Sequence, residues 1–95
     1  MRGIRLENDV DAELQDARES WPRVEDAWEA VEWVLVRDPT VGKPVSESGQ
    51  SRSFVYEGSY AHDMPNIEVL YVFDDQYVTI KSVRFSTPTF TAGSE

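Results

Sequence analysis

The stretch from residue 66 to residue 85, NIEVLYVFDDQYVTIKSVRF, constrains the fold more than any other part of this chain. Two segments rich in β-branched and aromatic residues flank the polar turn Asp74-Asp75-Gln76, a pattern typical of a β-hairpin. Side chains alternate along a strand, so the apolar residues of the first arm divide between the two faces of a sheet: Ile67, Val69, Tyr71 and Phe73 on one, Leu70 and Val72 on the other. The first arm is therefore predicted to be a central strand that is buried on both faces.

The second arm of the hairpin changes its apolar face part-way along. Val78 and Ile80 share one parity, whereas Val83 and Phe85 share the other. One extra residue in a strand produces such a switch. We therefore predict a β-bulge near Lys81-Ser82.

A first helix is predicted to begin at Asn8. An asparagine is a good side-chain cap, and acidic residues in the first turn interact favourably with the positive end of the helix dipole. Such acids follow Asn8 directly, and apolar residues then recur at helical spacing: Val10, Leu14, Ala17 and Trp21. The spacing predicts one buried side for this helix.

A second helix is predicted to begin at Pro22, because proline is well tolerated in a first helical turn. The Asp38-Pro39 step should end it, since the residue before a proline is pushed out of helical geometry. Between these limits lies one apolar stripe: Val24, Ala27, Trp28, Val31 and Leu35. The two helices should form a hairpin packed on a sheet.

The middle of the chain is rich in glycine, proline and serine, which favours loops. We predict a loop over residues 40–51, a short strand over residues 52–57 and a second loop over residues 59–65. Residues 87–95 are expected to form a mobile tail that Phe90 could dock. The predicted fold is α+β: a single domain, residues 1–86, with an N-terminal helical hairpin packed on a small twisted, mostly antiparallel β-sheet.

The chain is strongly acidic, with a formal net charge of −9. Residues 1–38 hold five arginines and eleven acids (5 − 11 = −6), and the remaining residues hold four basic and seven acidic side chains (4 − 7 = −3). The electrostatic field of this negative charge repels the phosphate backbone of nucleic acids. The acidic side chains are interpreted either as solvated helix faces or as a surface for a basic partner. The chain has no cysteine, no signal-peptide core and no membrane-spanning apolar run, which favours a cytoplasmic protein.

Two segments together resemble the RelE/ParE superfamily of bacterial toxin–antitoxin toxins. One is residues 25–39, EDAWEAVEWVLVRDP, and the other has the form x-V-L-Y-x-F-D-D-x-x-V-T-I-x-x-V. The matching residues of the second segment are Val69, Leu70, Tyr71, Phe73, Asp74, Asp75, Val78, Thr79, Ile80 and Val83. The resemblance covers residues 8 to 86.

The resemblance implies a small α+β fold, a cytoplasmic location and an antitoxin that wraps the toxin. A homodimer is a separate possibility, which an exposed Trp33 would favour. RelE-like members cut messenger RNA on the ribosome without a metal or other cofactor, and ParE-like members poison DNA gyrase. In metal-free cleavage, arginine or lysine must balance charge on the phosphate, and a polar group must move the proton of the ribose hydroxyl.

The sequence departs from the RelE-like nucleases at their catalytic positions. Those enzymes usually carry an arginine just before the V-L-Y triplet, where this chain has Glu68. The resemblance leaves Arg52 and Arg84 as catalytic candidates, whereas no tyrosine follows Tyr77. Tyr71 is interpreted as a core residue.

Three other polar or aromatic features have two readings each, and a fourth has one. His62 is either a general base or a solvated loop residue. Lys81 and Arg84 form either a small basic partner-binding spot on the hairpin edge or charges that keep an edge strand from aggregating. Trp33 lies off the apolar stripe of its helix, so it either contacts a partner or fills the core. Asp74-Asp75 is read as a turn, because no calcium-loop spacing surrounds it.

Three hypotheses for function follow. The first is a toxin-like component of a type II module that binds a cognate antitoxin. The second is a ribosome-dependent endoribonuclease, which requires Arg52 and Arg84 to converge on one concave face. The third is a non-toxic binding or regulatory protein with the same fold, which Glu68 and the acidity favour.

Overall fold

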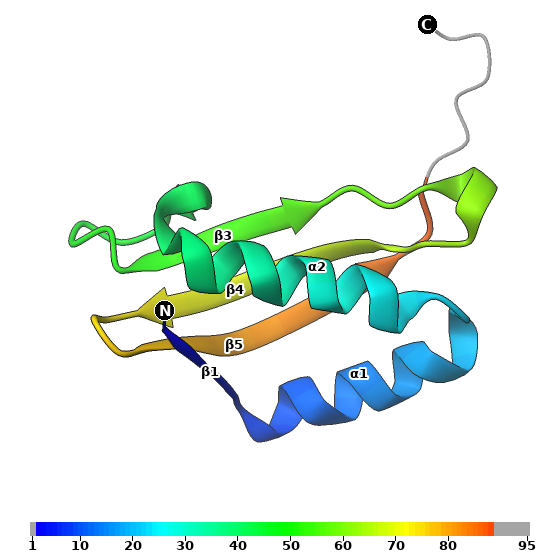
Figure 1. Ribbon diagram of the computed structural model, residues 1–95, viewed down its shortest axis with the longest axis horizontal. Helices are drawn as coiled ribbons and strands as arrows, with labels where there is room; N and C mark the ends of the chain where they lie inside the picture. The colour runs from blue at the N-terminus through cyan, green and yellow to red at the C-terminus, as the bar shows by residue number, and fades with distance from the viewer. Residues whose placement is uncertain (1, 89–95) are drawn as a thin grey trace, which may run out of the picture.

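The structure of the chain, a computed structural model, describes residues 2–88. It is an α+β fold in which two helices lie over one face of a five-stranded mixed sheet (Figure 1). From residue 89 onward the expected mobile tail, including Phe90, lies outside the described residues. The elements in chain order are β1 (Gly3–Leu6), α1 (Asn8–Ser20), α2 (Val24–Arg37), the 3-10 helix η1 (Pro39–Val41), β2 (Lys43–Pro44), β3 (Ser51–Tyr56), the 3-10 helix η2 (Tyr60–His62), β4 (Asn66–Phe73) and β5 (Tyr77–Ser86).

The strands are ordered β1-β5-β4-β3-β2 across the sheet. β1 runs parallel to β5, and the other three pairings are antiparallel, so the sheet is mostly antiparallel as predicted. The sequence analysis did not predict β1. The predicted loop over residues 40–51 also contains β2 and the end of η1, and β3 begins and ends one residue earlier than predicted.

The predicted hairpin and its bulge are confirmed. β4 and β5 pair in antiparallel register, with Tyr71 opposite Ile80 and Leu70 opposite Ser82, so Lys81 is the extra residue. At the turn, an Asp74 carboxylate oxygen accepts hydrogen bonds of 2.8 Å from the backbone N–H groups of Gln76 and Tyr77. These bonds satisfy the backbone where the chain reverses.

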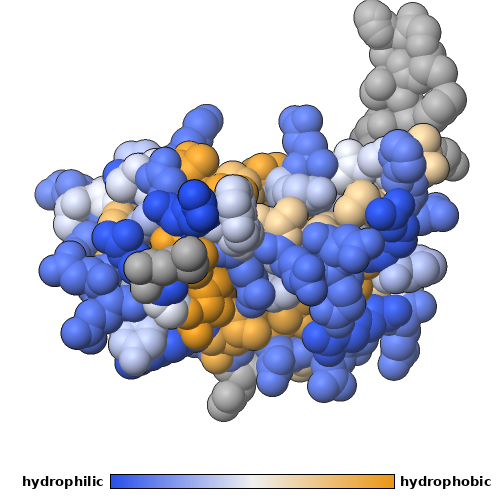
Figure 2. All heavy atoms as spheres, viewed as in Figure 1, coloured by the Kyte–Doolittle hydropathy of each residue, from blue (hydrophilic) through white to orange (hydrophobic). Residues whose placement is uncertain are grey.

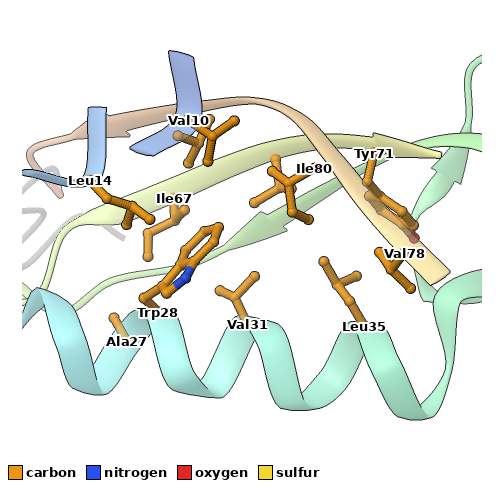
Figure 3. Close-up of a cluster of buried hydrophobic side chains, with 12 residues drawn as sticks. Val10, Leu14, Ala27, Trp28, Val31, Leu35, Ile67, Tyr71, Val78 and Ile80 are labelled. Atoms are coloured by element: carbon orange, nitrogen blue, oxygen red, sulfur yellow. The ribbon is translucent and has the colours of Figure 1, made fainter. Parts of the chain in front are cut away.

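The core lies between the helices and the covered face of the sheet (Figure 3). The predicted stripe of α2 is confirmed, because all five of its residues are buried. The stripe of α1 is buried over its helical part, while Trp21, just beyond the helix end, is half-buried. The largest cluster of buried residues comprises Val10, Leu14, Ala27, Trp28, Val31, Leu35, Ile67, Val69, Tyr71, Val78, Ile80 and Val83.

The prediction that β4 is buried on both faces is wrong. Tyr71 is fully buried, but its neighbour Leu70 is 39% exposed and Val72 is half-buried. The reason is that α1 and α2 both pack on the Tyr71 side of the sheet. Within residues 2–88 the other side carries no helix (Figure 1).

The predicted start of α1 at Asn8 is confirmed, but the predicted cap of α1 and the predicted start of α2 are wrong. The N-cap position belongs to Glu7, whose side chain makes no capping hydrogen bond and instead pairs with Lys81 at 2.8 Å. α2 begins at Val24, because Pro22 lies in the turn between the helices. The predicted end is confirmed at Arg37, just before the Asp38-Pro39 step.

Candidate binding surfaces

The uncovered side of the sheet presents a row of polar and apolar side chains. Residues paired across strands share a face, so the register groups Ser53 with Leu70 and Ser82, and Val55 with Glu68 and Arg84. We call this surface the open sheet face. It is defined by Ser53, Val55, Glu68, Leu70, Ser82 and Arg84.

Two adjacent hollows lie on the open sheet face, with volumes of about 590 and 390 Å³. Glu68 and Arg84 line both of them. Their exposed apolar side chains include Val55 in the larger hollow and Leu70 and Val45 in the smaller one. The two valines are 56% and 55% exposed, so this face offers apolar contact area around a charged centre.

The charged centre is an ion pair between Arg84 and Glu68, with 3.5 Å between Nη1 and Oε1. The Arg84 side chain is 80% exposed, so water screens the attraction and the pair adds little stability. The Glu68 carboxylate therefore balances the charge of Arg84 and adds negative charge where a bound phosphate would need cations.

Arg52, the other catalytic candidate, points to the opposite side of the sheet. It pairs in register with buried Tyr71, so it shares the face that the helices cover. Its guanidinium donates hydrogen bonds from Nε to the Gly49 carbonyl at 2.7 Å, and from Nη1 to the carbonyls of Thr40 and Gly42 at 3.0 and 2.8 Å. Arg52 thus holds the loop around β2, and the structure does not bring it together with Arg84.

Tyr71 is a core residue, as predicted, but it also anchors the chain after α2. Its hydroxyl donates to the Pro39 carbonyl at 2.6 Å and accepts from the Gly42 N–H at 3.1 Å. Burial raises the pKa of this phenol. A side chain at Gly42 would place its Cβ 2.7 Å from both the Tyr71 hydroxyl and the Ser53 carbonyl oxygen, so this close approach requires glycine.

Trp33 is 58% exposed, so it lies on the surface and does not fill the core. The Arg37 guanidinium lies 4.4 Å from the centre of its ring, in a cation–π contact. Lys81, the other partner-binding candidate, is at the bulge of β5, where it pairs with Glu7. These two candidates contact different elements and do not form one site.

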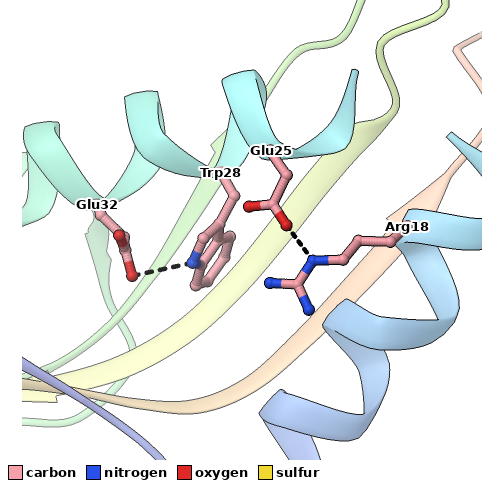
Figure 4. Close-up of polar contacts among 4 residues, drawn as sticks. All are labelled: Arg18, Glu25, Trp28 and Glu32. Carbon is pink, nitrogen blue, oxygen red and sulfur yellow. Dashed lines mark hydrogen bonds and ion pairs between the residues drawn. The ribbon is translucent and has the colours of Figure 1, made fainter. Parts of the chain in front are cut away.

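α2 also carries a half-buried carboxylate. Trp28 Nε1 donates a 2.9 Å hydrogen bond to Glu32, and Arg18 of α1 pairs with Glu25 at the other end of the helix (Figure 4). Burial raises the pKa of Glu32, the negative charges of Glu29 and Glu25 raise it further, and the hydrogen bond from Trp28 opposes them. The folded state therefore disfavours the negative charge of the Glu32 carboxylate.

The remaining polar candidates form no catalytic constellation in the part of the chain that the structure describes. His62 is exposed and its Nδ1 lies 2.8 Å from the Ser59 hydroxyl oxygen. Over residues 2–88 there is no group of three or more histidine and carboxylate side chains that could hold a metal ion. Likewise, neither described helix is long and apolar enough to cross a membrane.

The sequence analysis did not predict a cation–π contact on the uncovered side of the sheet. The Arg5 guanidinium lies 3.6 Å from the centre of the Tyr77 ring, and the two residues come from neighbouring strands, β1 and β5. No local signal joins them, because their contact depends on the unpredicted strand β1.

Comparisons of the chain with protein-family models, curated proteins and solved structures found no match.

Proposed function

We propose that this protein is the toxin-like component of a bacterial type II toxin–antitoxin module, and that it acts by binding an antitoxin on the open sheet face. The observation that carries the proposal is the uncovered apolar surface around Glu68 and Arg84. Exposed apolar area on one face of a small domain is typical of a protein–protein contact. The helical hairpin and the V-L-Y strand are the features on which the RelE/ParE resemblance rests.

The partner must match an apolar surface that carries one charge of each sign. A segment with small or branched apolar side chains would cover Val55 and Leu70, while its own polar groups would face Arg84 and Glu68. Such a segment would remove both hollows from water. Its binding would depend on apolar contact more than on the exposed ion pair.

Induced expression in a bacterial host tests the toxin part of the proposal. We expect growth arrest that co-expression of the neighbouring small gene of the source genome relieves. The same neighbour protein should co-purify with the chain. Normal growth with a folded chain that still binds the neighbour would replace the toxin function with the non-toxic binding function.

A pair of variants tests the surface. Leu70→Arg places a charge on the open sheet face and should weaken antitoxin binding by tenfold or more, on the order of 1.4 kcal/mol. Ala12→Arg adds the same side chain to the exposed side of α1 and should leave binding unchanged. Equal binding by both variants would move the antitoxin to another surface.

The geometry gives less support to the ribosome-dependent nuclease. That hypothesis needs Arg52 and Arg84 on one concave face, and the register places them on opposite sides of the sheet. The pairing of Arg84 with Glu68 favours the non-toxic binding protein as the second candidate. Cleavage of ribosome-bound message by the purified chain, lost in Arg84→Ala, would restore the nuclease hypothesis.

A further inference from the structure

The outer side of α2 carries an exposed tryptophan among charged residues. Asp26, Glu29, Trp33 and Arg37 are all exposed, and spacings of three and four residues place them along one side of the helix. We call this surface the Trp33 face. A tryptophan that is 58% exposed keeps a large apolar area in water, as residues at binding surfaces do.

The helical layer that carries Trp33 is strongly negative as a whole. Residues 8–37, which form α1, α2 and the turn between them, hold three arginines and nine acids (3 − 9 = −6). The rest of the chain holds six basic and nine acidic side chains (6 − 9 = −3). Figure 2, which views the helical side, shows hydrophilic side chains over much of this surface. The helical layer therefore attracts cations more strongly than the sheet does.

The negative charge of the helical layer favours a basic segment of another protein over a second copy of this chain as the binding partner. A second copy of the chain would bring one layer of charge −6 against another, and like charges across an interface oppose association. A basic segment would instead gain from the same field. The nearest ion pair of the Trp33 face, Arg23 with Asp26 at 3.4 Å, is exposed and exchanges readily for a partner's arginine or lysine.

We propose that the Trp33 face docks a basic amphipathic helix of another protein. An apolar side chain of that helix covers the Trp33 ring, and its lysine or arginine residues face Glu29 and Asp26 one and two turns earlier. This inference goes beyond the antitoxin proposal, because it uses the helical side of the molecule. It holds or fails independently of what binds the open sheet face.

The first test uses the full chain and a synthetic amphipathic helical peptide with leucine on one side and arginine and lysine on the other. Trp33→Ser should weaken peptide binding by about tenfold or more, as expected for an aromatic anchor. Leu70→Ser, an exposed apolar change on the opposite side of the sheet, should leave the affinity unchanged. Added salt should weaken binding to the unmodified chain.

A second readout locates the peptide. Proton–nitrogen spectra resolve the indole N–H signals, and Trp33→Phe identifies the signal of Trp33 by its loss. Peptide addition should shift that signal and leave the signal of buried Trp28 in place. Equal affinity of the unmodified chain and Trp33→Ser would overturn the proposal, because binding would then depend on charge alone.

The oligomeric state supplies the remaining outcome. Sedimentation of the purified chain should give a monomer, with no effect of Trp33→Ser. A dimer that Trp33→Ser abolishes would overturn the proposal and make a second copy the occupant. The antitoxin proposal is unaffected by either result, since Leu70→Arg and Ala12→Arg test it on a different partner.

Discussion

The two faces of the sheet use the same strand, β4, in opposite ways. Tyr71 and Leu70 are neighbours in one apolar run, yet the first is fully buried and the second is 39% exposed. The covered face holds the core, and the open sheet face holds two hollows around an ion pair. An apolar run in a sequence therefore predicts a strand, but burial of each side depends on what the rest of the chain stacks on it.

The largest expected difference between the faces comes from one substitution made on each. Leu35→Ala leaves a cavity under α2 and should lower the free energy of unfolding by about 2 to 5 kcal/mol. Leu70→Ala removes a side chain that is already partly in water and should cost less than about 1 kcal/mol. Urea titration of both variants measures the contrast. Similar losses would mean that the open sheet face contributes to stability as a core does.

A second prediction concerns the hydroxyl that ties the covered face to the chain after α2. Tyr71→Phe leaves the Pro39 carbonyl and the Gly42 N–H without their buried partner, and should cost about 1 to 3 kcal/mol. Thermal and urea unfolding measure this loss. A Phe variant as stable as the unmodified chain would show that water replaces the hydroxyl.

A third prediction sharpens the role of the hairpin turn that joins the two central strands. Hydrogen bonds from the Gln76 and Tyr77 backbone lower the pKa of Asp74, so its contribution is present above the ordinary value of 3.8 and is lost as the pH falls through the lowered pKa. Asp74→Ala should lower the midpoint of thermal unfolding at pH 7. The difference from the unmodified chain should shrink in acid, whereas Asp74→Asn, which keeps an acceptor oxygen, should lose less at pH 7.

The smallest expected effect lies at the edge of the covered face. Burial raises the pKa of Glu32, so the folded state disfavours its charge, and stability is lost as the pH rises from about 4.5 through the raised pKa. Glu32→Gln keeps an acceptor for Trp28 Nε1 and removes the charge. It should stabilise the chain at pH 7 by less than about 1 kcal/mol, because the site is partly solvated. Paired melts at pH 4 and pH 7 check the sign, and a destabilised variant at pH 7 would refute it.

Local patterns predicted much of this fold. The stripe of α2, the end of that helix at the Asp38-Pro39 step, the hairpin and its bulge each depend on neighbours within one element or one turn. Periodicity and proline chemistry encode such features directly. The sequence therefore predicted the α+β class and the central strands correctly.

The features that the sequence did not predict depend on contacts between distant segments. β1 is a strand of four residues whose partner, β5, lies more than 70 residues later, and such a short segment carries little periodic signal. The separation of Arg52 from Arg84 follows from strand register, which the sequence alone did not fix. The exposure of Trp33 was also open, because the apolar stripe predicts which side of α2 meets the sheet but not whether another segment covers the opposite side.

The bulge at Lys81 also marks where this hairpin tolerates a change in chain length. Ile80 faces the helices and Ser82 faces the open side, so deletion of Lys81 joins two residues that already alternate correctly. Deletion of Thr79 would instead turn Ile80, the one residue between the gap and the bulge, to the wrong side of the sheet. Lys81 is therefore a spacer within β5, and its removal would cost the contact with Glu7 while leaving the inward and outward order of the strand intact.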